Sequence, residues 1–293
     1  MNPVRFGLGA ASMFVRELIT HDHQPRGQPP STLLGTQRII AAMEDGGGVN
    51  QRTAGGYLFH SGRISQAIAG SECCVDLGCG TGAQLLQVAL LNPATHFIGV
   101  DIDPVMIRAG TAHASELGLT NVEWIVADAA GALAIQRRRV DAAISTMALH
   151  DLRDFNVLAS FLSTMNALRG PTGAVYIEDF ARLRAARSID FFAKLNAPIP
   201  PDAHSVLFRC GLESAFTLEE LTAACVVLTG ATLHSTYLVP FMVVVQTPAR
   251  ELSVATRARL LAMRAALTKA NRRDLDDLRR LFALGGLRND PFA

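Results

Sequence analysis

The sequence has few cysteines, few aromatic residues and little net charge. Its 293 residues include five cysteines, with no C-x-x-C pair and no Cys/His spacing typical of a zinc site. An odd number of scattered thiols fits a reducing compartment better than a disulfide framework. We therefore expect a cytoplasmic protein without a bound metal.

The formal net charge is only +1 at pH 7, so the sequence does not imply a polyanionic partner such as a nucleic acid. Arg137, Arg138 and Arg139 form the one dense basic run, which is typical of a solvated loop. The longest apolar stretch, residues 223–245, contains His234 and Pro240, so we expect no membrane span. Apolar residues make up 49% of the chain, enough for a substantial core.

Short apolar runs alternate with segments of helical periodicity from residue 72 onward. The apolar runs cover residues 73–77, 97–100, 122–126, 140–144 and 174–177, and the helical segments cover residues 83–91, 104–117, 130–137 and 155–168. Continuous apolar runs are typical of strands buried on both faces of a sheet. The five strand–helix repeats therefore predict a doubly wound α/β fold with a mostly parallel sheet and helices on both faces.

Helical segments flank this central region on both sides. Three are predicted before it, at residues 4–19, 32–43 and 57–69. After it come two strands, at 231–238 and 241–246, and two amphipathic helices. We expect a helical N-terminal cap over residues 1–70, a domain over 71–250 with a lid insert at about 180–216, and a helical extension over 251–293. The extension either packs on the domain or forms a homodimer contact.

The stretch VDLGCGTG, residues 75–82, lies between the first strand and the first helix of the repeat. In an open parallel sheet this turn lines the ligand crevice at the carboxyl ends of the strands. Gly78, Gly80 and Gly82 let the backbone turn tightly and approach a ligand. A dinucleotide fold requires G-x-G-x-x-G, but here the third glycine comes one place early.

One acidic residue lies at or near the carboxyl end of each of the first three predicted strands. Asp76 precedes the glycines, where its carboxylate attracts an ammonium group. Asp101 ends the second strand, where a carboxylate can accept both hydroxyls of a ribose. Asp128 ends the third strand and can hold the exocyclic amine of adenine. S-adenosylmethionine contains all three of these partners and has no phosphate.

The chain resembles the class I S-adenosylmethionine-dependent methyltransferases. VDLGCGTG matches their glycine motif, IGVDID the acid of the second strand, VADA the adenine motif, and ISTMALHDL the segment after the fourth strand. NALRGPTGAVYIEDF matches the approach to the fifth strand, although the glycine–proline order differs there. The resemblance covers residues 70–246 and implies a seven-stranded sheet with an antiparallel last strand.

The resemblance also implies roles for the cofactor-binding residues. Gly78, Cys79 and Gly80 are expected to line the methionine and the ribose through their backbones, with Ile102 packed on the adenine. The N–H of Ala129 is expected to read the adenine edge beside Asp128, and the carbonyl of Ser145 to help hold the amino group. The alternative is that the acids are strand-end caps and loop residues.

Candidate catalytic residues follow the fourth and fifth strands. His150 is the best candidate for a general base, because this loop faces the transferable methyl group in the family, and Asp151 is positioned in sequence to orient its imidazole. The alternative is that His150 packs beside the adenosine. Glu178 and Asp179 end the fifth strand and are candidates to activate or bind the acceptor, although Asp179 is equally a helix N-cap.

The residues expected to contact the acceptor lie in the segments that cover the crevice: Tyr57, His60, Asp179, Arg182 and His204. We predict methyl transfer to O, N or C of a small metabolite or natural-product intermediate. A protein or peptide acceptor and a non-catalytic S-adenosylmethionine-binding subunit remain alternatives. The glycine spacing disfavours a nicotinamide enzyme.

Overall fold

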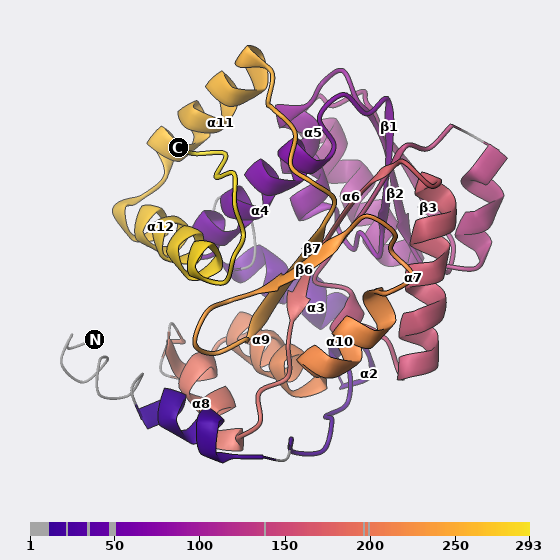
Figure 1. Ribbon diagram of the computed structural model, residues 1–293. Coiled ribbons are helices and arrows are strands. Elements are labelled where there is room, and N and C mark those ends of the chain that lie inside the picture. The colour runs from indigo at the N-terminus through magenta and orange to yellow at the C-terminus, as the bar shows by residue number, and fades with distance from the viewer. Residues whose placement is uncertain are drawn as a thin grey trace.

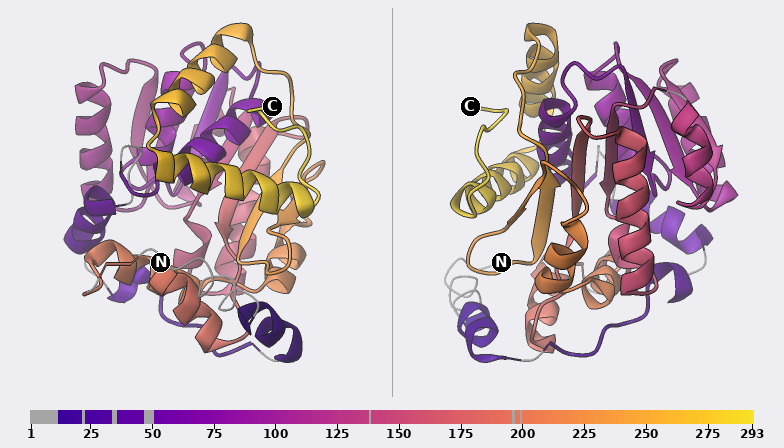
Figure 2. Two further views of the ribbon diagram at one scale, coloured as in Figure 1. Left: turned by 90° about the vertical axis from the view of Figure 1, so that its left-hand side faces the viewer. Right: turned by 45° about the vertical axis from the view of Figure 1, so that its right-hand side comes forward.

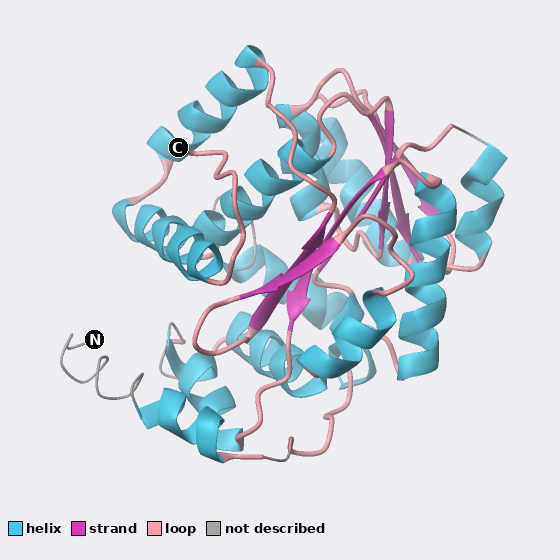
Figure 3. Ribbon diagram, viewed as in Figure 1, coloured by secondary structure: helices cyan, strands magenta, loops and turns pink. Residues whose placement is uncertain are grey.

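The computed structural model describes residues 12–21, 23–33, 36–46, 51–137, 139–195, 197–198 and 200–293, and shows a seven-stranded sheet of order β3-β2-β1-β4-β5-β7-β6 (Figures 1 and 3). The parallel strands are β1 (Cys73–Leu77), β2 (His96–Asp101), β3 (Val122–Val126), β4 (Ala142–Thr146) and β5 (Ala174–Phe180). The last strand, β7 (Met242–Gln246), runs antiparallel to β5 and to β6 (Thr232–Ser235). The predicted fold class is therefore confirmed.

Helices cover both faces of the sheet (Figures 1 and 2). On one face lie α4 (Ala54–Ala67) and α5 (Ala83–Leu91), with α6 (Pro104–Glu116) packed against β2 and β3. On the other lie α7 (Phe155–Arg169), α10 (Leu218–Cys225) and the 3-10 helix η1 (Gly131–Arg137). The predicted helix at 130–137 is thus a 3-10 helix.

Successive side chains of a strand point to opposite faces, and this divides the core into two layers. On β5, Ile177 packs toward α7 and α10, whereas Tyr176 packs toward α4, α5 and the C-terminal helices. By the same alternation, Glu178 lies on the side of Tyr176 and Asp179 on the side of Ile177. The side chains of Glu178 and Asp179, near the end of β5, therefore lie on opposite faces of the sheet.

Among the parallel strands, β4 and β5 differ most from their predicted limits. β5 extends three residues further, to Phe180, because β7 pairs with it along that length, with Phe180 opposite Met242. β4 begins at Ala142, two residues later than predicted, because the Asp141 carboxylate accepts from the backbone N–H groups of Glu72 and Cys73. Both differences depend on contacts with residues far away in the sequence.

The C-terminal helices α11 (Val254–Ala266) and α12 (Lys269–Leu284) lie outside α4, as Figures 1 and 2 show. Leu275 and Phe282 of α12 are fully buried in the same core layer as Leu58 of α4. Gly55 of α4 is in close contact with the backbone carbonyl of Asn271, which only a glycine permits. The extension thus packs on the domain, which was one of the two predicted roles.

The remaining helices gather at the carboxyl edge of the parallel strands (Figure 1). They are residues 12–19, α2 (Pro30–Leu33), α3 (Thr36–Gly46), α8 (Ala186–Leu195) and α9 (Ala203–Ser214). Of the predicted segments, residues 4–11, 34, 35 and Arg138 lie outside the described residues. No helix among the described residues has the length and apolar character needed to cross a membrane.

Candidate active site

The glycine loop between β1 and α5 has the conformation that its sequence predicts. Gly78, Gly80 and Gly82 all have positive φ, of 73°, 53° and 73°, a region that side chains with a Cβ rarely adopt. A Cβ on Gly78 would lie 2.7 Å from the Cβ of Ala148, in the loop after β4. A Cβ on Gly80 would meet nothing within 4 Å. The loop is therefore fixed at Gly78 and open to a ligand at Gly80.

Two backbone hydrogen bonds hold the loop against the second strand. The N–H groups of Gly78 and Cys79 both donate to the carbonyl oxygen of Val100, at 2.8 and 3.1 Å. Gly82 begins α5 beside the ring of Trp124 on β3 and has no room for a side chain. The loop thus joins the carboxyl ends of three neighbouring strands.

Asp76 is buried at the end of β1, with 1% of its surface exposed. Its Oδ1 atom has no hydrogen-bond partner among the described residues. Burial raises the pKa of this carboxyl group well above its usual range, and the charge of Asp101 raises it further. A buried, unpartnered carboxylate is costly, and an ammonium group is the partner that would satisfy it. The site therefore fits the amino group of S-adenosylmethionine.

Asp101 ends β2 and faces the glycine loop. Its Oδ2 accepts from the N–H of Gly80 at 2.8 Å and its Oδ1 from the N–H of Asp103 at 2.9 Å. Burial raises the pKa of the Asp101 carboxyl, although these two hydrogen bonds act in the opposite direction. The next residue, Ile102, is 71% exposed. An exposed isoleucine beside a fixed carboxylate fits the predicted contact with an adenosyl group.

Asp128 follows β3 and is exposed. Its Oδ1 accepts from the N–H of Gly131 at 2.6 Å, so the carboxylate caps η1. Ala129 is partly buried beside it. This contact matches the alternative prediction, that Asp128 is a loop residue. The contact of Asp128 with adenine remains a prediction.

The loop after β4 closes the crevice opposite the glycines. Ser145 is buried, and its hydroxyl donates to the carbonyl oxygen of Leu77 on β1 at 2.8 Å. Met147 has a φ of 54°, which is rare for a residue with a side chain, and its N–H donates to the carbonyl oxygen of Glu178. Such strain persists where the surroundings hold it in place, and it is concentrated at functional sites.

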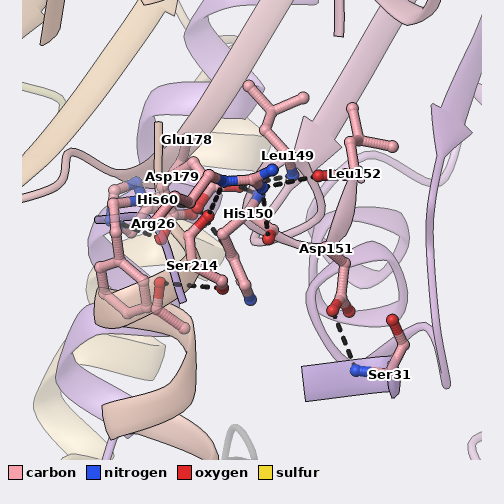
Figure 4. Close-up of polar contacts among 12 residues, drawn as sticks. Arg26, Ser31, His60, Leu149, His150, Asp151, Leu152, Glu178, Asp179 and Ser214 are labelled. Carbon is pink, nitrogen blue, oxygen red and sulfur yellow. Dashed lines mark hydrogen bonds and ion pairs between the residues drawn. The ribbon is translucent and has the colours of Figure 1, made fainter. Parts of the chain in front are cut away.

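His150 is buried and forms a hydrogen bond with Asp179, not with Asp151 as predicted. Its Nδ1 lies 2.7 Å from Asp179 Oδ1, as Figure 4 shows. Burial lowers the pKa of His150, but the charge and hydrogen bond of Asp179 outweigh this effect and raise the pKa above its usual value. The carboxyl ends of the adjacent strands β4 and β5 bring the two groups together.

The predicted role of Asp151 is therefore corrected. Its Oδ1 accepts from the N–H of Ser31 in α2 at 3.1 Å, and the side chain points away from the imidazole of His150 (Figure 4). The sequence placed Asp151 next to His150, but the turn of η2 (Leu149–Asp151) sends the two side chains in different directions. Asp151 fixes the start of α2 instead.

Glu178 and His60 form a buried pair on the other face of the sheet. His60 Nε2 lies 3.3 Å from Glu178 Oε1, and His60 Nδ1 is hydrogen bonded to the hydroxyl of Tyr176 at 2.7 Å. Burial, with a contribution from Arg63, lowers the pKa of His60 to about 3, so its imidazole is neutral. The prediction that His60 reaches the acceptor is wrong, because the side chain is 2% exposed and engaged inside the fold.

Burial and the nearby charge of Asp179 raise the pKa of Glu178 well above its usual range. Burial and then Glu178 also raise the pKa of Tyr57, which is half-buried in the first turn of α4. These two groups therefore lie near each other at the carboxyl end of β5, and Tyr57 remains a candidate for contact with the acceptor.

Arg182 is not positioned as predicted. Its guanidinium lies 3.6 Å from Glu220 of α10, with 9% of its side chain exposed. Arg182 is not among the residues that line the cavity beside Phe208 and Phe241. His204 does line that cavity, and its contact with an acceptor remains a prediction.

Arg26 was missed in the sequence because it lies in a proline- and glycine-rich segment without a motif. Its guanidinium donates to four backbone carbonyl oxygens at 2.6–3.1 Å (Figure 4): those of His150, Leu152, Arg153 and Ser214. It also lies 3.9 Å from the centre of the Phe216 ring. This one side chain ties the N-terminal segment to the loop that bears His150.

A cavity of about 440 Å³ lies where the carboxyl end of β5 meets the amino end of β7. Phe208 in its wall packs edge-on against Phe180, the last residue of β5. The Phe180 ring in turn lies 5.6 Å from the ring of His150. Gly56, next to Tyr57, lines the cavity from the side of α4. The cavity is therefore linked to His150 through the rings of Phe208 and Phe180.

Comparisons with known proteins agree with this geometry. A family model described as a methyltransferase domain matches residues 71–204. An uncharacterised methyltransferase of Mycobacterium tuberculosis is 33% identical over 112 residues, which are 38% of this chain and 52% of the relative. A tRNA (guanine-N(7)-)-methyltransferase of Rubrobacter xylanophilus is 29% identical over 26% of this chain and 38% of its own length. The chain thus spans about half or less of these curated relatives.

Solved structures share the fold at low sequence identity. The plantazolicin methyltransferase BpumL in complex with SAH has a TM-score of 0.54 and 11% identity, covering 90% of this chain and 95% of that chain. An O-methyltransferase family protein from Burkholderia thailandensis has a TM-score of 0.53 and 16% identity, covering 84% and 71%.

The sheet order, the glycine loop and the acid at the end of β2 define a Rossmann-like methyltransferase fold. Together with the match to the methyltransferase-domain model over residues 71–204, they support a class I S-adenosylmethionine-dependent methyltransferase. The cofactor of this family is S-adenosylmethionine.

Proposed function

We propose that the chain transfers a methyl group from S-adenosylmethionine to an O, N or C atom of a small apolar acceptor. The observation that supports this is the cavity of about 440 Å³, whose wall residue Phe208 packs on Phe180, and Phe180 in turn packs on His150. Cavities of a few hundred Å³ with mostly apolar walls are typical of small-molecule sites.

The cofactor residues act by binding and orientation. Asp76 receives the amino group, Asp101 the ribose hydroxyls, and the open backbone at Gly80 allows close approach. Ile102, Asp128 and Ala129 are proposed to contact the adenine. When bound, S-adenosylmethionine supplies the methyl group on an already activated sulfonium. What remains for the protein is alignment and, for some acceptors, removal of a proton.

His150 is the group proposed to remove that proton. Asp179 Oδ1 holds Nδ1 of the imidazole, which leaves Nε2 as the nitrogen able to accept a proton from the acceptor. Glu178 is buried in its pair with His60, so Tyr57, which is half-buried in the first turn of α4, is the residue proposed to contact the acceptor there. A carboxylate acceptor would need alignment only.

Alignment and exclusion of water come from the helices at the carboxyl edge. Met43 of α3 lies 3.9 Å from the hydroxyl of Thr81 in the glycine loop, so α3 reaches over the cofactor side. α9 reaches over the acceptor side through His204 and Phe208. Correct alignment of two reactants can supply roughly 7–11 kcal/mol of the barrier reduction.

The test is a methylation assay with S-adenosylmethionine and a panel of small apolar amines, phenols and carboxylic acids, read by mass spectrometry. A gain of one methyl group on a panel member is expected with the native chain and not with Asp101→Ala. Calorimetry with S-adenosylhomocysteine checks that Asp101→Ala has lost cofactor binding. Methylation of peptides or proteins with no turnover of any small molecule would contradict the proposal.

The cellular setting belongs to the same proposal. All five cysteines are free thiols, which supports a reducing cytoplasm. The tRNA methyltransferases among the relatives match at most 26% of this chain. The mostly apolar cavity favours a small molecule over a nucleic acid as the acceptor.

A further inference from the structure

Aromatic side chains form much of one side of the cavity. Phe191 and Phe192 come from α8, Phe208 from α9, and Tyr237 and Phe241 from the segment between β6 and β7. The ring of Phe192 stacks on that of Phe241, with 4.3 Å between centroids. The faces of aromatic rings attract cations, with Trp and Tyr the stronger partners. The cavity wall is thus mostly apolar, yet its aromatic rings can attract a cation.

The opposite side is formed by α12, which brings two carboxyl groups to the cavity. Asp277 is exposed and paired with Arg280 at 3.3 Å. Asp274 is half-buried, and no cation among the described residues lies within ion-pair distance of it. Burial, followed by the charge of Asp277, raises the pKa of Asp274. Asp274 is therefore a carboxylate that lacks a counterion.

The basic side chains of the wall do not supply that counterion. Arg52 is paired with Asp202 at 3.0 Å. Burial, then the charge of Arg52, lowers the pKa of His204, which disfavours a positive charge on its imidazole. The described walls of the cavity therefore have one uncompensated negative charge, at Asp274.

We infer that the acceptor of this cavity is a cationic amphiphile: an amine with an aromatic or branched apolar body, whose ammonium group lies at Asp274 and whose body lies among the phenylalanines. This inference rests on the proposed function, because it names the substrate class of the same site. An anionic acceptor would meet Asp274 without a compensating cation. A neutral acceptor would leave the Asp274 charge without a partner.

The test uses two probes of nearly the same shape, phenyltrimethylammonium and tert-butylbenzene. The quaternary probe cannot accept a further methyl group, so its binding is independent of turnover. Calorimetric titration of the full chain, saturated with S-adenosylhomocysteine, is expected to show at least about tenfold tighter binding of the cationic probe, from cation–π and carboxylate contacts together. Equal affinities, or tighter binding of the neutral probe, would overturn the inference.

Variants assign the preference to Asp274. Asp274→Asn is expected to remove most of the difference between the two probes, and Asp274→Glu to keep it. Glu116→Gln, on the exposed side of α6, makes the same change in net charge far from the cavity and is expected to leave both affinities unchanged. A cationic preference that survives in Asp274→Asn, or disappears in Glu116→Gln, would contradict the assignment.

The outcomes separate this inference from the proposed function. If the cationic probe binds at Asp274 but no small molecule is methylated, the proposed function fails and the cavity remains a binding site for cations. If neutral or acidic members of the panel are methylated while amines are not, the proposed function stands and the inference fails.

Discussion

At the residue scale, the site concentrates carboxyl groups whose ionisation is unfavourable in the ligand-free protein. Burial raises the pKa values of Asp76, Asp101 and Glu178, all of which lie at the carboxyl ends of strands. A folded-state pKa above the unfolded value makes the free energy of unfolding fall as the pH rises from the lower value to the higher. These carboxyl groups therefore lower the free energy of unfolding at neutral pH. A bound cationic ligand would offset that loss.

Asp76→Asn is expected to stabilise the ligand-free chain by roughly 1–3 kcal/mol at neutral pH, because it removes a buried carboxyl with an unpartnered oxygen. The same change is expected to weaken binding of S-adenosylhomocysteine by at least about tenfold, through loss of the partner for the amino group. Thermal unfolding and calorimetry measure the two effects. A variant that is less stable and binds normally would show that Asp76 is structural.

His150→Gln is expected to lower kcat by about 10²–10⁴-fold if the acceptor must lose a proton, since this is the usual contribution of a general base. Affinity for S-adenosylhomocysteine is expected to stay within about twofold, because the imidazole bonds to Asp179 and not to the glycine loop. Steady-state kinetics and calorimetry give the comparison. Unchanged turnover would exclude His150 as the base.

Asp179→Asn tests the pH dependence of the same pair. Asp179 raises the pKa of His150 against the effect of burial, so the neutral base forms only as the pH rises through this raised value. The variant is expected to shift the acid limb of the kcat profile to lower pH. A second readout is stability: the contribution of the pair is complete below the unfolded pKa of histidine and is lost as the pH rises through the folded pKa. A pH profile identical to that of the native chain would refute the coupling.

At the scale of elements, the N-terminal segment holds the active-site loops in place. Gly27 N–H donates to the carbonyl of Glu213 at the end of α9, and Glu17 accepts from the N–H groups of Arg184 and Ala185 before α8. Arg26 then bonds to the loop after β4. Elements from three parts of the chain therefore meet around His150.

Arg26→Met is expected to lower kcat by about tenfold or more while leaving the affinity for S-adenosylhomocysteine unchanged, because the four carbonyl contacts position the His150 loop and not the cofactor crevice. Arg26→Lys recovers little, since an ammonium cannot reproduce the planar fork of donors. Kinetics with calorimetry distinguish positioning from folding: equal losses in kcat and in cofactor affinity would indicate a general structural role.

At the scale of the whole molecule, the C-terminal helices extend the core beyond the sheet. The side chains of Leu260, Leu275 and Phe282 are fully buried, and the ring of Phe282 stacks on Phe59 of α4 with 5.4 Å between centroids. Arg63 of α4 donates to the carbonyl oxygens of Arg288 and Asn289. The C-terminal extension is thus joined to the helix that borders the acceptor cavity.

Gly55→Ala tests this junction. A Cβ there would overlap the carbonyl oxygen of Asn271, so the change is expected to lower the free energy of unfolding by about 1–3 kcal/mol. Gly56→Ala is the matched control, because its Cβ would lie 3.7 Å from Leu278, an ordinary contact. The control is expected to be neutral or stabilising, since alanine favours helix over glycine by about 1 kcal/mol. Equal effects of the two substitutions in chemical denaturation would show that α12 moves freely against α4.

The sequence by itself determined the parallel sheet and the position of the cofactor loop. These depend on local signals: apolar runs of strand length, helical periodicity, and glycines where the backbone has positive φ. VDLGCGTG and Asp101 could be assigned for the same reason, since a strand end places its residues at the crevice whatever surrounds it.

The tertiary structure decided which side chains meet. Asp179 rather than Asp151 holds His150, His60 faces Tyr176 inside the core, and Arg26 crosses to a loop more than one hundred residues away in sequence. The burial of these side chains, the shifts of their pKa values and the shape of the cavity all depend on packing between distant segments. A short stretch of sequence does not specify that packing. The acceptor side was therefore decided by tertiary structure, and the cofactor side by the order of residues along the chain.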